Sequence, residues 1–425
     1  MNAELLEALA ESHGIELAYR DIWSHERRAE PAVLSQLLRA MGVDADSDAS
    51  LQHALQEQRR AQWHRMVPAY ALPAGPHAPI VLRLPAELWS RTLRWRVVED
   101  GGAGHEGELR VSDRRELERE SLDGHDHAAF EWRLPPSLPD GYHRLLLADG
   151  DRSLGEGLLI VAPSKCHRPL ALRGGARVWG VAAQLYAVRS ARNWGVGDFT
   201  DLAAVADFWG RRGAAIIGVN PLHALFPHDP AHASPYSPSS RRFLNALYLD
   251  VEAIADFAEC AAARDRVREP AFQARLQALR ESPLVDYQGV AQLKWPLLEA
   301  LFQHFETNHL AHKTLRAQAF AAFCDERGVA LQRHTCFEAL QEHFFAADAS
   351  VWGWPAWPPE YRHPDAPAVR SFADTYRSRL QFFAYVQWQC DEQLGAVARQ
   401  AGEWGIGLYN DLAVAADRAG ADAWS

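Results

Sequence analysis

The residues best suited to bind a ligand lie between Gly218 and Asp250, in a stretch rich in proline, serine and histidine. Within it, Tyr236, Arg242 and Asn245 offer an aromatic ring, a guanidinium group and an amide, which can bind a polar ring-shaped ligand by stacking and hydrogen bonding. The prolines disfavour both a helix and a strand ladder, so the sequence predicts a long loop. Long loops inside compact domains are usually functional or disordered, and this composition favours binding.

Other candidates for binding lie before and after this loop. Asn193 and Trp194 belong to an earlier loop, and Trp352, Trp354 and Trp357 belong to a later one. Two interpretations remain open for the tryptophans, because flat aromatic faces suit sugars but also seal a core.

Some polar residues have a structural interpretation as good as the functional one. Arg241 and Arg242 could serve only to neutralise Asp250 or Glu252. Asp198 precedes an expected helix, which is typical of an N-cap.

Several kinds of chemistry are not indicated. The chain contains no G-x-S-x-G, H-E-x-x-H or G-x-x-x-x-G-K-[ST] motif. His223, His228 and His232 lie with Asp229 on a proline-containing loop without rigid ligand spacing, so we expect no metal there. His309 and His312 could share a helix face, but we expect them to be exposed to solvent.

Composition restricts the partners and the compartment. The net charge is −11, and no run of five or more basic residues occurs, which argues against nucleic acid and anionic membranes as partners. No segment approaches the roughly 18 apolar residues of a spanning helix. The five cysteines are odd in number and contain no C-x-x-C, which favours reduced thiols in the cytoplasm.

The N-terminal part of the chain changes its hydrophobic period once. Residues 1–63 repeat apolar positions every three or four residues, which predicts a helical segment that includes a helix starting at Pro31 and stopping at Gly42. Residues 67–163 contain short alternating runs between turns, which predict a small immunoglobulin-like β-sandwich. This sandwich could be a carbohydrate-binding module, but no aromatic platform is evident, so a packing or spacer domain is the preferred interpretation.

From residue 170 to residue 425 the pattern becomes strand–helix–strand. Strands are expected at Val178–Tyr186, Ala215–Val219 and Gly405–Ala415. A helical insertion is expected at 251–347, with breaks at Pro270, Pro283 and Pro296, and a long helix at Ser371–Gln400. A complete (β/α)8 barrel needs about 250 residues without insertions. The predicted fold class is therefore α/β, an incomplete (β/α)8 TIM barrel with a helical insertion, preceded by the helical segment and the sandwich.

Six segments together resemble one enzyme family, the bacterial amylomaltases (4-α-glucanotransferases or disproportionating enzymes), in the long form with an N-terminal extension. In chain order they are Gln184–Ser190, Asn193–Phe199, Asn220–Pro227, Ser234–Asn245, Trp352–Pro358 and Gly407–Val414. The resemblance implies a cytoplasmic enzyme that transfers α-1,4-glucan segments between maltodextrins with retention, without cofactor or metal. Retention implies a nucleophilic carboxylate and a second carboxyl about 5 Å apart.

The family's catalytic residues follow later barrel strands, in Arg-x-Asp-His, Glu-Asp-Leu-Gly and His-Asp motifs. The resemblance implies that all three lie beyond Ser425, that the chain is C-terminally truncated, and that it is inactive alone. Tyr236 matches the tyrosine that stacks under the sugar at the cleavage point, and Asp417 stands two residues from the acidic position that the family carries after strand three. The implied substrate-binding residues are Tyr236, Ser234, Asn193, Trp194, Asp198, Asn245 and Asp417.

An alternative from a different class is a non-catalytic α-glucan-binding or scaffold protein. An α-amylase-type hydrolase is disfavoured, because the end of the third strand lacks that group's Asn-His pair.

Overall fold

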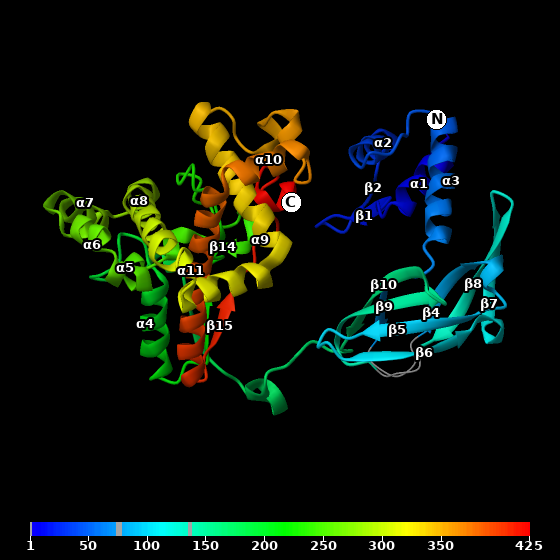
Figure 1. Cartoon of the computed structure of the whole chain (residues 1–425), viewed down its shortest axis with the longest axis horizontal. Coiled ribbons are helices and arrows are strands. Elements are labelled where there is room, and N and C mark those ends of the chain that lie inside the picture. The colour runs from blue at the N-terminus through cyan, green and yellow to red at the C-terminus, as the bar shows by residue number, and fades with distance from the viewer. Residues whose placement is uncertain (1, 74–78, 135–137) are drawn as a thin grey trace. The chain divides into compact units, whose positions relative to one another are not determined.

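The computed structural model describes residues 2–73, 79–134 and 138–425 (Figure 1). Two compact units divide the chain, Met1–Arg168 and Pro169–Ser425. Residue 1 falls within the predicted helical segment, and residues 74–78 and 135–137 fall within the predicted sandwich; all of them lie outside the described residues.

The first unit begins with helices α1 (Ala3–Ser12), α2 (Pro31–Ala40) and α3 (Asp48–His64). Pro31 is the first residue of α2, and Gly42 follows its end with φ of +79°, which confirms both predicted boundaries. Strands β1 (Ala18–Arg20) and β2 (Glu26–Arg28) form an antiparallel hairpin that was not predicted. Most of its side chains are exposed, so it carries no alternating apolar pattern.

The described part of the β-sandwich contains a five-stranded and a three-stranded sheet. The strands of the five-stranded sheet are, in spatial order, β3 (Tyr70–Pro73), β10 (Arg152–Ala162), β9 (Gly141–Asp149), β5 (Thr92–Val98) and β6 (Gly104–Arg110). Those of the three-stranded sheet are β4 (Pro79–Pro85), β8 (His125–Arg133) and β7 (Arg115–Leu122). Trp95 of β5 and Trp132 of β8 meet in the core with ring centroids 5.7 Å apart. Strands β6 and β7 were not predicted, because their residues are mostly polar and exposed.

The second unit is built on a parallel sheet, ordered β11 (Gly180–Ala183), β12 (Ile216–Val219) and β15 (Gly407–Asn410) in the described residues. Gly180 is paired with Ile216, and any side chain at Gly180 would collide with the Ile216 carbonyl group.

The strands predicted at Val178–Tyr186 and Gly405–Ala415 are too long, and the prediction is wrong at their ends. The first strand stops because the chain turns into a 3-10 helix, Leu185–Ala187, where the Leu185 N–H donates to Asn220 Oδ1 (2.7 Å) instead of extending the ladder.

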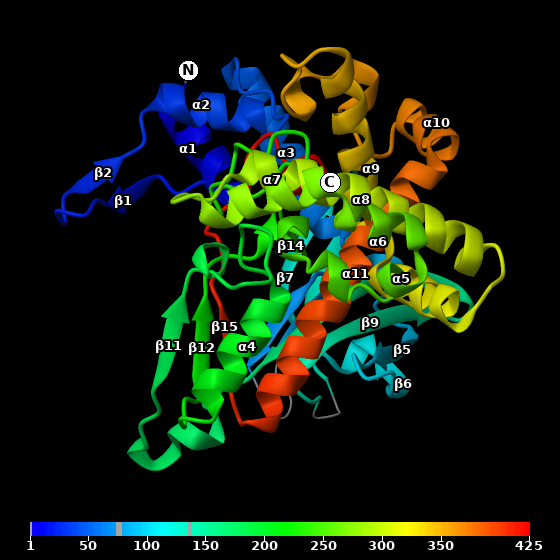
Figure 2. The same ribbon diagram turned by 90° about the vertical axis from the view of Figure 1, so that its left-hand side faces the viewer.

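Two helices, α4 (Phe199–Gly210) and α11 (Arg377–Glu403), pack together beside this sheet (Figure 2). The run Phe382–Cys390 of α11 is buried on every side, as expected for a helix in the middle of a unit. In the described residues, no helix is both long enough and apolar enough to cross a bilayer.

The remaining helices belong to the same unit. They are α5 (Ala255–Glu259), α6 (Ala261–Arg268), α7 (Pro270–Glu281), α8 (Tyr287–Phe305), α9 (Leu315–Ala347), α10 (Pro367–Thr375) and α12 (Ala421–Trp424). Helix α9 kinks at Gly328, whose φ of +53° is accessible to glycine. The single helix predicted for Ser371–Gln400 is wrong, because Tyr376 leaves helical geometry between α10 and α11.

Pro296 does not break the insertion where a break was predicted. It lies inside α8, although an interior proline costs about 3 kcal/mol. Leu293, Leu297 and Leu301 on the same helix are each at most 4% exposed. Their burial favours a continuous helix by more than the proline disfavours it.

Candidate functional site

Loops at the carboxyl ends of β11, β12 and β15 form the candidate functional site. Because the three strands are parallel, these ends lie at the same edge of the sheet. The loop after β11 contains residues 184–198, the loop after β12 contains residues 220–245, and the loop after β15 contains residues 411–420. All seven predicted binding residues lie in these loops or at their ends.

The loop after β12 contains a short ladder that was not predicted. Strand β13 (His223–Ala224) pairs antiparallel with β14 (Ser240–Leu244). The prolines that argued against a ladder all lie outside these two strands, so none of them removes a ladder hydrogen bond. The ladder fixes both ends of the loop and leaves residues 225–239 between them.

Ser234 and Tyr236 lie on the outer part of this loop. The Tyr236 side chain is 57% exposed, and Ser234 is also exposed. Asn245 is different, because it is 8% exposed and its Oδ1 accepts a hydrogen bond from the Leu247 N–H (3.0 Å). Tyr236 therefore has an open face that a planar or ring-shaped ligand can stack on.

The loop after β15 rests directly on the loop that carries Tyr236. The Asp417 N–H donates to the Pro238 carbonyl (2.8 Å), and the Asp417 carboxylate accepts from the Ala419 N–H (2.8 Å). Asp422 accepts from the Ser240 hydroxyl (2.5 Å) and from the Arg241 N–H (2.7 Å). Both carboxylates thus have structural partners close to Tyr236.

Arg241 does not neutralise Asp250 or Glu252. Its guanidinium donates to the carbonyl oxygens of Ala413 and Val414 (3.3 and 3.0 Å), which joins the loops after β12 and β15. Asp250 pairs instead with Arg192 (2.6 Å).

In the loop after β11, the predicted residues are buried. Asn193 is 1% exposed, and its Nδ2 donates to Asp201 Oδ2 (2.7 Å) and to the Val188 carbonyl (3.1 Å). Trp194 is 3% exposed, its indole N–H donates to Glu252 (3.2 Å), and its ring meets Phe272 edge-on.

Asp198 is the N-cap of α4, as its spacing predicts. It forms a capping box with Asp201, in which each carboxylate accepts from the other residue's N–H. Burial raises the pKa of Asp198 to about 6, while the positive charge of Lys294 opposes the increase. Asp201 and Asp250 raise the pKa further.

Lys294 was missed by the sequence reasoning. It is 1% exposed in α8, and its ammonium donates to the carbonyls of Leu247 and Leu249 (2.7 Å each). Burial lowers the pKa of Lys294, and Asp198 opposes that change. No local signal distinguishes this lysine from a surface lysine, because its partners come from the loop after β12.

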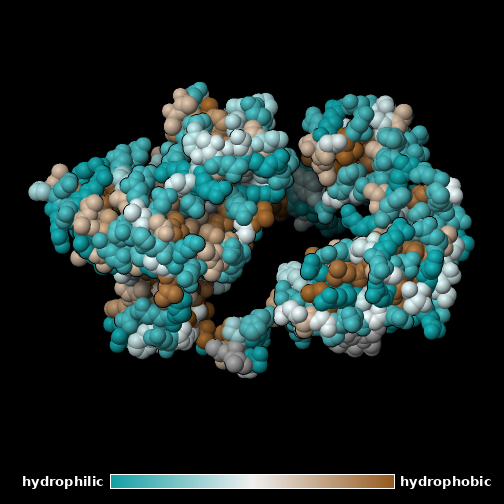
Figure 3. Space-filling view, in the orientation of Figure 1, coloured by the Kyte–Doolittle hydropathy of each residue, from teal (hydrophilic) through white to brown (hydrophobic). Residues whose placement is uncertain are grey.

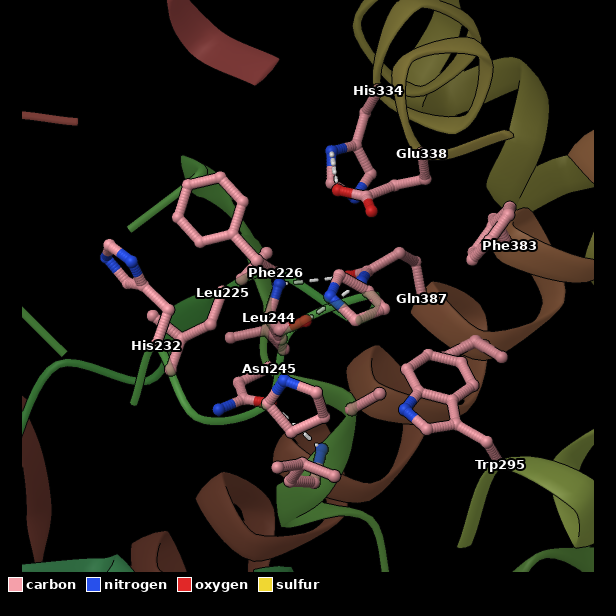
Figure 4. Close-up of a pocket in the computed structure, with 16 residues that line it drawn as sticks. Leu225, Phe226, His232, Leu244, Asn245, Trp295, His334, Glu338, Phe383 and Gln387 are labelled. Atoms are coloured by element: carbon pink, nitrogen blue, oxygen red, sulfur yellow. Dashed lines mark hydrogen bonds and ion pairs between the residues drawn. The ribbon is translucent and has the colours of Figure 1, made fainter. Parts of the chain in front are cut away.

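A small cavity lies under this loop (Figure 4). Its volume of about 30 Å³ holds one or two waters and is too small for a sugar ring. His334 and Glu338 of α9 line it opposite Gln387 of α11 (Figure 4). His334 Nδ1 and Glu338 Oε1 have no hydrogen-bond partner among the described residues.

Burial disfavours the charged form of both cavity residues. It lowers the pKa of His334 to about 3 and raises the pKa of Glu338 well above its usual range. The His334 ring stacks on Phe243, with centroids 4.2 Å apart. Neither residue was predicted, because both belong to a helix almost 100 residues further along the chain.

The tryptophans and histidines of the later loops form aromatic clusters. Trp357 is fully buried against Phe337 and Trp424. Trp352 is half-buried, and its ring stacks on His232 with centroids 5.4 Å apart. These contacts favour a structural role for Trp357 in the core, and they leave part of the Trp352 side chain exposed to solvent.

Two family models match the chain. The model described as 4-alpha-glucanotransferase matches residues 183–425, and the model described as MalQ N-terminal beta sandwich domain matches residues 66–163. The first covers more than half of the chain and contains all three loops of the candidate site.

Individual relatives agree with these models. A protein of Haemophilus influenzae named 4-alpha-glucanotransferase is 38% identical over 69% of this chain and 42% of its own length. One of Mycobacterium tuberculosis with the same name is 34% identical over 100% of this chain and 57% of its own length. The crystal structure of amylomaltase from Corynebacterium glutamicum matches with a TM-score of 0.77 at 26% identity, over 99% of this chain and 56% of that one.

The chain spans about half the length of the relatives it matches. The residues matched by the 4-alpha-glucanotransferase model include β12, β15, the last residue of β11 and the loops that follow the three strands. The chain therefore belongs to the 4-alpha-glucanotransferase family.

Proposed function

We propose that the loops after β11, β12 and β15 form one wall of the glucan-binding cleft of a 4-α-glucanotransferase. The enzyme transfers α-1,4-glucan segments between maltodextrins by a retaining double displacement. One observation carries this proposal: the exposed ring of Tyr236 stands at the carboxyl-end edge of a parallel sheet, within the residues that the family model matches. An apolar face surrounded by hydrogen-bonding groups suits a glucose ring.

The parallel sheet is proposed to be the first three strands of a (β/α)8 barrel. Helices α4 and α11 pack beside it, whereas Tyr409 of β15 is 70% exposed, and Leu412 and Val414 just after it are 64% and 97% exposed. Figure 3 shows brown and teal side chains mixed over the surface around α4, α11 and β15. Additional strands pairing with β15 would cover such apolar groups.

The predicted binding residues divide into exposed ones, which can contact substrate, and buried ones, which cannot. Tyr236 and Ser234 are proposed to touch the sugar, because both are accessible. Asn193, Trp194 and Asp198 are proposed to hold the loops in place, since their polar atoms already have buried partners.

Asn245 and Asp417 also have partners within their own turns, and they are proposed to shape the loop around Tyr236. The catalytic carboxylate pair is proposed to lie outside these 425 residues, so the chain alone binds maltodextrin without transferring it.

Binding and transfer can be tested separately. Binding is measured by titrating the purified 425-residue protein with maltoheptaose in a calorimeter. We expect the affinity to fall at least tenfold in Tyr236→Ala and by less in Tyr236→Phe, because loss of a stacking platform costs about 1–3 kcal/mol. Tyr142→Ala is the matched control, because Tyr142 is 63% exposed in the first unit. Equal binding by Tyr236→Ala and Tyr142→Ala would contradict the proposed wall.

Transfer is measured as glucose released from maltotriose. We expect none from the 425-residue protein, and release at a normal rate would show that the catalytic carboxylates are within it. Binding without transfer in every product of the gene would favour a non-catalytic glucan-binding protein instead.

A further inference from the structure

Two histidines and a glutamate meet at the end of α8, outside the three loops described above. The group consists of Glu259, the last residue of α5, together with His304 and His309. Their ligand atoms all lie within 4.8 Å of one another. His304 Nε2 is 3.5 Å and His309 Nε2 is 3.1 Å from Glu259 Oε2.

A π-turn brings the two histidines together. Residues Glu306–Leu310 form a π-helix, in which the Ala311 N–H donates to the Glu306 carbonyl (3.1 Å) and the Thr314 N–H to the His309 carbonyl (3.3 Å). In an α-helix, side chains five residues apart diverge, but the wider π-turn aligns them. The expectation that His309 is exposed is therefore wrong, because its side chain is only 12% exposed. Single π-turns within helices frequently mark functional sites.

We propose that Glu259, His304 and His309 bind a zinc ion, with water as the fourth ligand. Tetrahedral zinc with bonds of about 2.0–2.1 Å places its ligand atoms about 3.3 Å apart. The two distances to Glu259 Oε2 lie on either side of that value, and all three ligand atoms lie within 4.8 Å of one another. Two imidazoles and one carboxylate are a ligand set that zinc prefers.

The long contact of His304 Nε2, which lies 3.5 Å from Glu259 Oε2, supports a missing ligand. This nitrogen is buried and has no hydrogen-bond partner among the described residues. Such an atom is costly unless something binds it. The neighbouring Asp256 does not complete the site, since it already pairs with Arg316 (2.7 Å) and accepts from the Tyr385 hydroxyl (2.7 Å). Glu259 is 51% exposed, so the ion can enter from solvent.

Side chains behind the two histidines contact their second ring nitrogens, and the one behind His309 is already placed to accept a hydrogen. His309 Nδ1 is 3.0 Å from Thr314 Oγ1, which can accept its hydrogen and leave Nε2 free for the metal. His304 Nδ1 is 3.1 Å from the Asn308 side-chain nitrogen. Zinc binding at His304 Nε2 moves the ring hydrogen to Nδ1, so the exposed Asn308 amide must turn to accept it. A carboxylate at that position accepts this hydrogen without turning and makes the imidazole more basic.

The ion joins α5 to the end of α8 and to the π-turn. Both helices belong to the helical insertion, and neither contributes a residue to the loops around Tyr236. Zinc here is therefore a structural link and takes no part in glucan transfer.

The test measures zinc affinity in the tag-free protein after treatment with a chelator, by competition with a chromophoric chelator. Because Cys166 is an exposed thiol, all proteins carry Cys166→Ser. We expect one zinc per chain, weakened at least tenfold in His304→Gln and in His309→Gln. His312→Gln is the matched control, since His312 is exposed on the same segment, and its affinity stays unchanged.

Asn308→Asp provides an independent readout, because we expect it to bind zinc about tenfold more tightly than the parent protein. Circular dichroism shows whether each variant is folded. Parent-like affinity in both histidine variants would overturn the proposal, and so would an Asn308→Asp variant that binds no more tightly than the parent.

Discussion

The loops after β11 and β12 have similar compositions but opposite exposures. The first contains Asn193 and Trp194, at 1% and 3% exposure, and the second contains Ser234 and Tyr236, with Tyr236 at 57% exposure. The first loop is covered because α7 packs on it: Arg280 donates to the Asn193 carbonyl (2.7 Å), and Phe272 meets the Trp194 ring.

This difference shows that residue type alone does not separate a binding loop from a structural one. An asparagine and a tryptophan suit a sugar site, but the same groups can satisfy and fill an interior. The distinction is made by α7, which belongs to the helical insertion and lies more than 70 residues after Trp194. The following substitutions test whether the two loops differ in this way.

The largest expected effect is on the first loop. Trp194→Ala removes a buried ring and its hydrogen bond to Glu252, and it should lower the free energy of unfolding by about 3–5 kcal/mol. Tyr236→Ala is the matched aromatic truncation on the second loop, and it should change the free energy of unfolding by less than about 0.5 kcal/mol. Urea unfolding followed by circular dichroism measures both, and similar losses in the two variants would remove the distinction.

A pH-dependent effect is expected at Asp198. Its folded pKa is about 6, above the ordinary value of 3.8, so the folded state holds a proton that the unfolded state releases between pH 4 and pH 6. Stability due to this group therefore falls as pH rises through that window, by about 3 kcal/mol at most, and is constant above it. Asp198→Asn keeps a good N-cap and should remove this fall.

Asp207→Asn is the control for that experiment. Asp207 accepts a hydrogen bond from Arg211, which lowers the pKa of the Asp207 carboxyl. Its titration therefore changes the free energy of unfolding only below pH 4. Urea unfolding at intervals between pH 4 and pH 7 distinguishes the two. If the free energy of unfolding of Asp198→Asn falls with pH as steeply as that of the parent protein, burial does not hold the proton on Asp198.

The smallest of the three effects is expected at Asn193. Asn193→Ala removes the Nδ2 donor from the Val188 carbonyl and from Asp201 Oδ2, which then keeps only the Asp198 N–H, and this loss should cost about 2 kcal/mol. Ser234→Ala, on the exposed loop, should change stability by less than about 0.5 kcal/mol. Thermal unfolding of the two variants gives the comparison, and an equal shift in Tm would argue against the structural role of Asn193.

Much of the local structure was predictable from short-range patterns. The start of α2 at Pro31, the N-cap at Asp198 and the apolar sandwich strands depend on neighbouring residues, so the sequence indicates them directly. The polar strands β6 and β7 were not predictable in this way, because their pairing depends on partners and not on their own composition.

The family-like segments lie together at one edge of the sheet, because loops after parallel strands must gather there. Which of their residues face solvent was decided by contacts across the chain. Lys294 lies between the loops after β11 and β12, α7 covers Trp194, and a proline inside α8 is tolerated because the leucines around it are buried. The meeting of Glu259 with His304 and His309 likewise depends on a π-turn and on the packing of α5. The sequence by itself determines side-chain types and the local hydrophobic periodicity, whereas the burial of each residue results from the packing of segments that lie far apart in the chain.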